Sequence, residues 1–286
     1  MPFILMKEHR QSPSRTTRMT LTYIALFIFI LFAVYALTHI LAIALQPGTQ
    51  PLSTSVANLL HGTKATSSHP LFFDPGFLRW LGSSSLVALG VTITGVALAS
   101  TAGYTFSRFN CLGWSATVDG LVAQIMPAAI FLLPTFFLLD RLSLLSSYFG
   151  VVIVYSATAL PFCIWQMKNS YDTIPFSLEE AARIEGATRW QTFRFVILPL
   201  SATAIIITAL FSFLVAWNEY IIAAIRFQDV KLFTLPPGLE LSLSNMNVRW
   251  GWYGAGALLV SFAVVILFLI LSPFLVSRPS SGEMKG

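Results

Sequence analysis

Six stretches without a charged side chain constrain this chain more than any other feature of its sequence, because each has 20 residues or more. A helix of about 20 mostly apolar residues crosses the hydrocarbon core of a bilayer. Lipid offers no partner for free backbone N–H and C=O groups, and the stretches lack the two-residue alternation of barrel strands. The sequence therefore predicts an all-α, polytopic membrane protein with six transmembrane helices. The predicted spans are 21–45, 80–107, 120–139, 142–167, 195–218 and 250–277.

The basic residues predict which side of the membrane each loop occupies. With a cytoplasmic N-terminus, eleven of the 17 Lys and Arg residues fall on the cytoplasmic side and six on the outer side. Because cytoplasmic loops are enriched in Lys and Arg, this split favours cytoplasmic N- and C-termini. We expect a cytoplasmic tail (1–18), a membrane domain (19–277) with an outer loop (46–79) and a cytoplasmic loop (168–195), and a second cytoplasmic tail (278–286).

Glycines and prolines inside the predicted spans bear on how the helices pack. Gly90, Gly95 and Gly103 lie in the second span, where small residues let membrane helices approach closely. Pro161 and Pro199 lie in or beside later spans, and proline kinks a helix because it lacks an N–H group. Such kinks either serve a gated pathway or merely shape the bundle.

Several functional classes are disfavoured. No basic run is interleaved with aromatic residues, so the net charge of +5 reflects the cytoplasmic loops and not nucleic-acid binding. Cys111 and Cys163 lack metal-ligand spacing, and the four His residues all lie in the first quarter of the chain. The sequence contains no H-E-x-x-H motif and no Gly-Lys dipeptide, which a phosphate-binding P-loop requires. We expect no catalytic residue, no metal site, no cofactor and no enzymatic activity.

The cytoplasmic loop at 168–195 carries the most informative local pattern. Pro175 stops the preceding helix, and Ser177 with Glu180 matches the S-x-x-E capping box, so a short helix is expected to begin there. Gly186 permits the sharp change of direction that must follow it.

One face of this short helix is small in its middle and acidic at its end. A helix of about nine residues is marginal alone in water, so a partner surface is expected to hold it. The alternative is an exposed linker with ordinary i,i+4 pairs, such as Glu179 with Arg183. The face consists of Leu178, Ala181, Ala182 and Glu185.

The loop and the segment after it have a distinctive spacing: Glu180-Ala181-Ala182 is followed after three residues by Gly186, after nine more by Val196, and after one more by Leu198-Pro199. This spacing resembles the coupling-loop signature of permease subunits of binding-protein-dependent ABC importers. Further matches are similar to the carbohydrate-uptake branch of this family. They are Gln124-Ile125-Met126-Pro127, Leu133-Pro134, Leu160-Pro161-Phe162 with Trp165, Ile174-Pro175, Glu185-Gly186-Ala187, Trp217-Asn218-Glu219-Tyr220 and Lys285-Gly286.

The resemblance implies a multi-pass permease of the cytoplasmic (inner) membrane that imports a sugar by alternating access. An oligosaccharide or related polyol-type solute is implied, with a maltose-type substrate favoured. The implied partners are a second, non-identical permease, two ATPase subunits that hydrolyse ATP, and an extracytoplasmic solute-binding protein. By the same resemblance Glu180, Ala181, Ala182, Glu185 and Gly186 couple the permease to the ATPase.

Polar and aromatic side chains of the spans are candidates for sugar contact. Asn218 and Glu219 lie toward the outer end of the fifth span, where an ionisable group is a candidate site. Glu219 alternatively sits at the interface beside Tyr220. Gln124 and Tyr155 could bind a sugar by hydrogen bonding or stacking, although aromatic residues at these depths more often pack or anchor helices.

A self-sufficient secondary carrier or channel for a small polar solute is the alternative function. It would need coupling-ion groups deep in the membrane, yet the predicted spans are nearly free of Asp, Glu, Lys and Arg. The two three-span halves also show no matching broken helices. Both observations favour the importer.

Overall fold

The computed structural model describes residues 15–44, 75–109, 129–145, 147–226, 232–241 and 250–276. Every regular element in these segments is helical, which confirms the all-α class. The elements are α1 (Arg15–Ala44), α3 (Pro75–Arg108), α5 (Ala129–Arg141), α6 (Tyr148–Asp172), α7 (Phe176–Ile184), α8 (Arg189–Thr192), η2 (Phe193–Ile197), α9 (Leu198–Leu200), α10 (Ala202–Asn218), α11 (Ile221–Arg226), α12 (Leu235–Leu241) and α13 (Trp250–Val276).

Four described helices, α1, α3, α6 and α13, contain segments long and apolar enough to cross a membrane. A fifth span results if Arg189–Leu200 and Ala202–Asn218, which meet at 79°, count as one broken helix. These five coincide with five of the six uncharged stretches. The remaining stretch, 120–139, is described only from Ala129 onward, as part of α5, so the sixth span stays a prediction.

The bend between α9 and α10 follows from Pro199. Proline cannot donate a backbone hydrogen bond, and its ring clashes with the carbonyl one turn earlier. The preceding turn widens into the π-helix η2, and the chain breaks at Ser201 before α10 begins. The predicted kink at Pro199 is therefore confirmed, whereas Pro161 lies within a single continuous α6.

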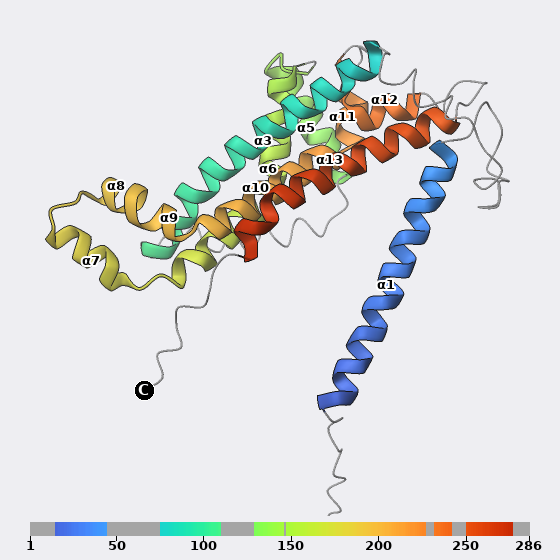
Figure 1. The fold of residues 1–286 in the computed structure, drawn as a ribbon. Helices are drawn as coiled ribbons and strands as arrows, with labels where there is room; N and C mark the ends of the chain where they lie inside the picture. Colours follow the sequence, from blue (N-terminus) through green and yellow to red (C-terminus); the bar gives the residue numbers. More distant parts are fainter. Residues whose placement is uncertain are drawn as a thin grey trace, which may run out of the picture.

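The central part of the bundle consists of three helices that pack against one another, α3, α6 and α10 (Figure 1). The glycines of α3 make this close packing possible, as predicted. A Cβ on Gly90 would lie 3.0 Å from Val152 Cγ2, and one on Gly103 would lie 2.9 Å from Met167 Cβ. Gly95 approaches α10 in the same way.

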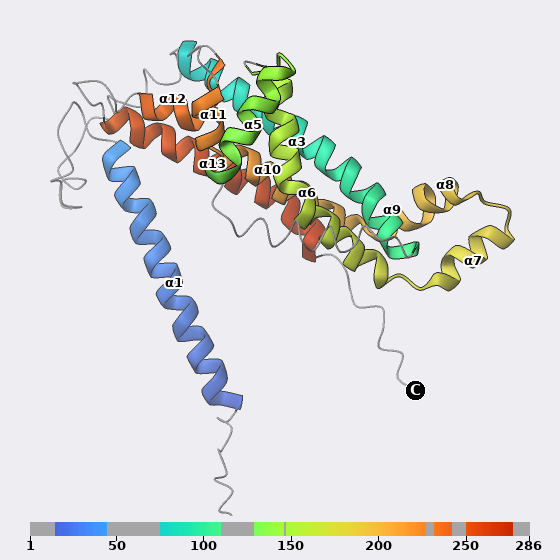
Figure 2. The ribbon, with the colours of Figure 1, turned by 180° about the vertical axis from the view of Figure 1, so that it is seen from behind.

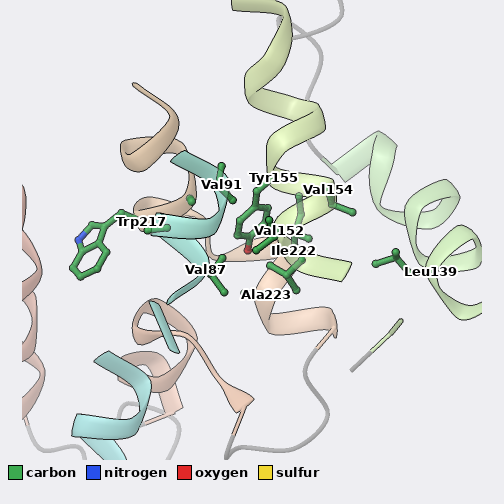
Figure 3. Packing of buried hydrophobic residues seen from close by; sticks show 12 residues of the cluster. Val87, Val91, Leu139, Val152, Val154, Tyr155, Trp217, Ile222 and Ala223 are labelled. Atoms are coloured by element: carbon green, nitrogen blue, oxygen red, sulfur yellow. The ribbon is translucent and has the colours of Figure 1, made fainter. Parts of the chain in front are cut away.

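Side chains from five helices meet in one apolar core (Figure 3). Val87 and Val91 of α3 pack there with Tyr155 of α6, Trp217 of α10 and Ile222 of α11. Leu139 of α5 closes the cluster. This core fixes the end of α10 that precedes Glu219.

The two ends of the bundle carry different elements (Figures 1 and 2). At one end, here the α12 end, Leu235 N–H donates to Ser84 Oγ over 2.7 Å, and Gly238 lies against the Trp80 ring. At the other end, here the α7 end, α7 and α8 project beyond α3 and α6. Helix α1 contacts α13 near Gly254, at the end of α1 that includes Ala44. The rest of α1 diverges from the bundle, and its side chains are exposed, for example Phe29 at 73%.

Candidate functional site

The short helix predicted in the cytoplasmic loop is present as α7, which is nine residues long. Its predicted capping box is wrong. Pro175 occupies the N-cap position with an extended backbone, so the helix starts at Phe176 and Ser177 already lies inside its first turn. A capping box does occur one element later, where Thr188 Oγ1 accepts from Gln191 N–H and Gln191 Oε1 accepts from Thr188 N–H.

Gly186 ends α7 with the predicted sharp turn. Its φ is +92°, a conformation that side chains with a Cβ rarely adopt. Gly186 N–H donates to Arg183 O over 3.0 Å, and Ala187 N–H donates to Ala182 O over 3.0 Å. This pair of bonds is a Schellman motif, which satisfies the last carbonyls of the helix and fixes its length.

Most of the α7 surface is exposed. Glu180, Ala181 and Glu185 are exposed and Ala182 is half-buried. Ile184 is 87% exposed although it is apolar. A short helix that presents small, acidic and apolar side chains outside its own bundle is suited to contact with another protein.

Glu179 is the exception on α7, since it is only 2% exposed. It forms an ion pair with Nε of Arg108, and its Oε2 accepts a hydrogen bond from Tyr104 O–H over 3.1 Å. The expected i,i+4 partner, Arg183, lies farther away, with 3.8 Å between Nη2 and Oε2. Arg108 and Tyr104 belong to the last turns of α3, and their role was not predicted because they lie more than 70 positions earlier in the chain.

A cavity of about 470 Å³ lies near the α12 end of the bundle. Asn218, predicted from the sequence, lines it. Glu219 does not line it; its Oε1 accepts from Ile222 N–H over 3.1 Å and so caps the start of α11. Other polar and aromatic lining residues were missed, because nothing in the sequence shows that α12 and α13 approach α10. These are Tyr220, Glu240, Tyr253 and Ser261.

The two remaining predicted path residues are elsewhere. Tyr155 belongs to the apolar core and is 1% exposed, and it does not line the cavity. Gln124 lies outside the described residues.

Solved structures that resemble the fold include two of bacterial alginate transporters. A bacterial ABC transporter involved in the import of the acidic polysaccharide alginate superposes with a TM-score of 0.74 at 20% identity, covering 96% of this chain and 100% of that one. A bacterial alginate ABC transporter in complex with an alginate pentasaccharide-bound periplasmic protein gives a TM-score of 0.61 at 16% identity. At these identities the likeness shows a common fold.

Sequence relatives extend over nearly the whole chain. It is 31% identical over 293 residues to the maltose/maltodextrin transport system permease protein MalG of Yersinia pestis, covering 96% of each chain. It is 32% identical over 294 residues to MalG of Escherichia coli strain K12, covering 96% of this chain and 99% of the relative. Residues 16–280 match the family described as "Binding-protein-dependent transport system inner membrane component". These matches over nearly the whole chain show that it belongs to this family of inner membrane transport components.

Proposed function

We propose that this chain is the permease subunit of an ABC importer for a sugar, and that a separate ATPase drives it through α7. The observation that carries the proposal is α7 itself, a nine-residue helix that projects from the bundle with Glu180, Ala181 and Glu185 exposed. The MalG relatives support a maltose-type oligosaccharide or related polyol-type solute as the substrate.

The chemistry of α7 fits docking into a cleft of a cytoplasmic ATPase. The small side chains of Ala181 and Ala182 let the helix backbone approach a partner closely, and Glu180 can accept hydrogen bonds from basic groups at the rim. The Schellman turn at Gly186 gives the helix a fixed end. Closure of the ATPase pair would then displace α7 and switch the bundle between inward- and outward-open states.

An importer of this kind has a defined membrane topology and a defined set of partners. The α7 end faces the cytoplasm, as do both termini, and the α12 end faces outward. A second, non-identical permease completes the pathway, two ATPase copies bind at the α7 end, and an extracytoplasmic binding protein delivers the sugar at the α12 end. The neighbour described with a pentasaccharide-bound periplasmic protein supports this arrangement.

The cavity at the α12 end is the proposed point of sugar contact. Tyr220 and Tyr253 offer aromatic rings and hydroxyl groups, and Asn218 offers an amide, which together suit the alternating apolar and polar faces of a sugar. Glu219 positions α11 beside this cavity. Contacts from Gln124 and Tyr155 stay predictions, and Tyr155 can reach a sugar only when the core opens.

Purification of the tagged full chain from its native membranes tests the proposal. We expect a second permease and an ATPase to co-purify, and the reconstituted complex to take up maltodextrin only with ATP and the binding protein. Ala182→Arg is expected to remove the ATPase from the complex, while Thr173→Arg, an exposed site at the same end but outside α7, is expected to retain it. Uptake by the chain alone, without ATP, would instead establish a stand-alone carrier or channel.

A further inference from the structure

Two consecutive glutamates of α7 have opposite surroundings. Glu180 is exposed, whereas Glu179 is buried against the bundle. Neighbouring residues of an α-helix point about 100° apart, so one helix can present one carboxylate to a partner and the other to its own subunit. The sequence motif includes Glu180 and assigns no role to Glu179.

The surroundings of Glu179 come from α3, a helix that has no direct chain connection to α7. Arg108 pairs with Glu179, donates from Nη2 to Ile174 O over 3.1 Å, and places its guanidinium 4.3 Å from the centre of the Phe176 ring. Tyr104 O–H donates to the second carboxylate oxygen. Arg108 therefore contacts α7 through a carboxylate and an aromatic ring, and the residue before its N-cap through a carbonyl.

A neighbouring contact joins the same end of α3 to α6. Ser107 O–H donates to Asp172 Oδ1 over 2.6 Å, and Lys168 pairs with Asp172 Oδ2 over 2.6 Å. The Lys168 pair is partly exposed and contributes little. Both side chains of the Arg108–Glu179 pair are buried, so separating them would leave each buried charge without its nearest charged partner.

The far end of α3 reaches the elements around the cavity. α3 is one uninterrupted helix of 34 residues, which corresponds to about 51 Å. Near its start, Ser84 accepts from Leu235 N–H, and Trp80 packs on Gly238 of α12. Leu239 and Glu240 of α12 line the cavity. A movement of α3 would therefore shift the α12 residues that line the cavity.

We propose that Arg108 and Glu179 form a latch that transmits displacement of α7 directly to α3, and through α3 to α12, while Glu180 contacts the ATPase. The inference rests on the proposed function, because it takes α7 as the helix that the ATPase moves. Glu179 and Arg108 are positioning residues in this scheme: they touch neither the ATPase nor the sugar. Their removal should uncouple hydrolysis from transport without detaching the ATPase.

The test uses the complete importer in proteoliposomes and measures three quantities: the amount of ATPase bound, the rate of ATP hydrolysis and the sugar transported per ATP. Glu179→Gln and Arg108→Gln are expected to retain the ATPase but lower the sugar transported per ATP at least fivefold. The exchange of the two charges in Arg108→Glu with Glu179→Arg is expected to restore part of this ratio. Lys168→Gln, which removes only the partly exposed ion pair with Asp172 at the same end of the bundle, is the matched control and should keep the wild-type ratio.

The outcomes separate the latch from the proposed function. If Glu180→Lys and Ala182→Arg leave the ATPase bound, the proposed function fails. If those variants lose the ATPase while Glu179→Gln keeps the wild-type ratio, only the latch is overturned. If Glu179→Gln lowers the amount of this protein in the membrane, the variant with the two charges exchanged decides. Recovery of both the protein level and the sugar transported per ATP supports the latch. Recovery of the protein level alone overturns it.

A covalent cross-link in place of the Arg108–Glu179 ion pair gives a second measurement. A variant with Arg108→Cys and Glu179→Cys, in a chain that also carries Cys111→Ala and Cys163→Ala, can be joined by a short bifunctional thiol reagent. Before reaction we expect the lowered ratio of the uncoupled variants, and after reaction a recovery of several-fold. A joined variant whose ratio stays low would overturn the latch.

Discussion

Gly95 of α3 lies directly against Ser212 of α10, so closely that a Cβ on Gly95 would sit 2.7 Å from Ser212 Oγ. Ser212 is fully buried at this contact and also bonds Cys163 of α6 over 3.3 Å. Three membrane helices therefore meet at one point. Because α10 ends at the cavity and α3 packs on α12, which lines it, the separation set by this glycine also affects the proposed sugar site.

The contact predicts that Gly95→Ala destabilises the assembled protein. Overpacking of a tight helix contact costs about 1–3 kcal/mol, so we expect a lower melting temperature in a fixed detergent. Gly82→Ala is the matched control on the same helix, since a Cβ there has no neighbour within 4 Å. Equal melting temperatures for the two variants would contradict this account of the packing.

The positive φ of Gly186 predicts a graded series of variants. A β-branched side chain in the left-handed region costs about 1–2 kcal/mol, so Gly186→Val is expected to distort the end of α7 and lower ATP-driven uptake. Gly186→Asn, which tolerates this region better, is expected to retain more uptake. Because no atom lies within 4 Å of a Cβ at this position, similar uptake by the two variants would show that backbone strain does not control the coupling surface.

The cavity at the α12 end predicts effects on substrate affinity. Tyr253→Ala or Asn218→Ala each removes a potential hydrogen bond to the sugar, worth about 1 kcal/mol, or about fivefold in KM. Uptake kinetics in proteoliposomes measure this change. Thr101→Ala, exposed on α3 toward the α7 end, serves as the control, and an unchanged KM in both cavity variants would remove the cavity from the transport path.

Glu219 is expected to stabilise the fold, because its carboxylate oxygen caps the start of α11. Glu219→Ala removes the acceptor for Ile222 N–H and should destabilise the protein by about 1 kcal/mol, as the loss of a helix cap does. Glu219→Gln keeps an acceptor and should melt close to the wild-type temperature. If Glu219→Gln raises KM while stability is retained, the charge itself contacts the substrate.

Tyr155 requires a conservative test because it is buried in the core. Tyr155→Ala would leave a large cavity and cost about 3–5 kcal/mol, which obscures any transport effect. Tyr155→Phe removes only the hydroxyl group. A hydrogen bond from Tyr155 to the sugar requires a raised KM in this variant, and unaltered uptake kinetics would exclude that hydrogen bond.

The features that could be predicted from the sequence depend on local chemistry. A span is apparent because every residue in it must suit lipid, and the turn at Gly186 because a left-handed residue strongly favours glycine. The capping box at Ser177 failed because Pro175 takes the extended N-cap position two residues earlier. The inward orientation of Glu179 depends on Arg108, and the cavity on the approach of Tyr253 to Asn218. Such contacts arise from tertiary packing, which one sequence does not encode in its local pattern.

Because the helix is broken at Ser201, a tilt of α10 at this point would displace its far end at Asn218. The 17 residues of α10 extend about 26 Å from the bend to Asn218. A tilt of about 10° at the bend would therefore move the Asn218 side chain about 4–5 Å, which is close to the width of a pyranose ring. If the proposed alternating access tilts α10 at this bend, a small angular change there would displace Asn218 far enough to admit or exclude one sugar unit.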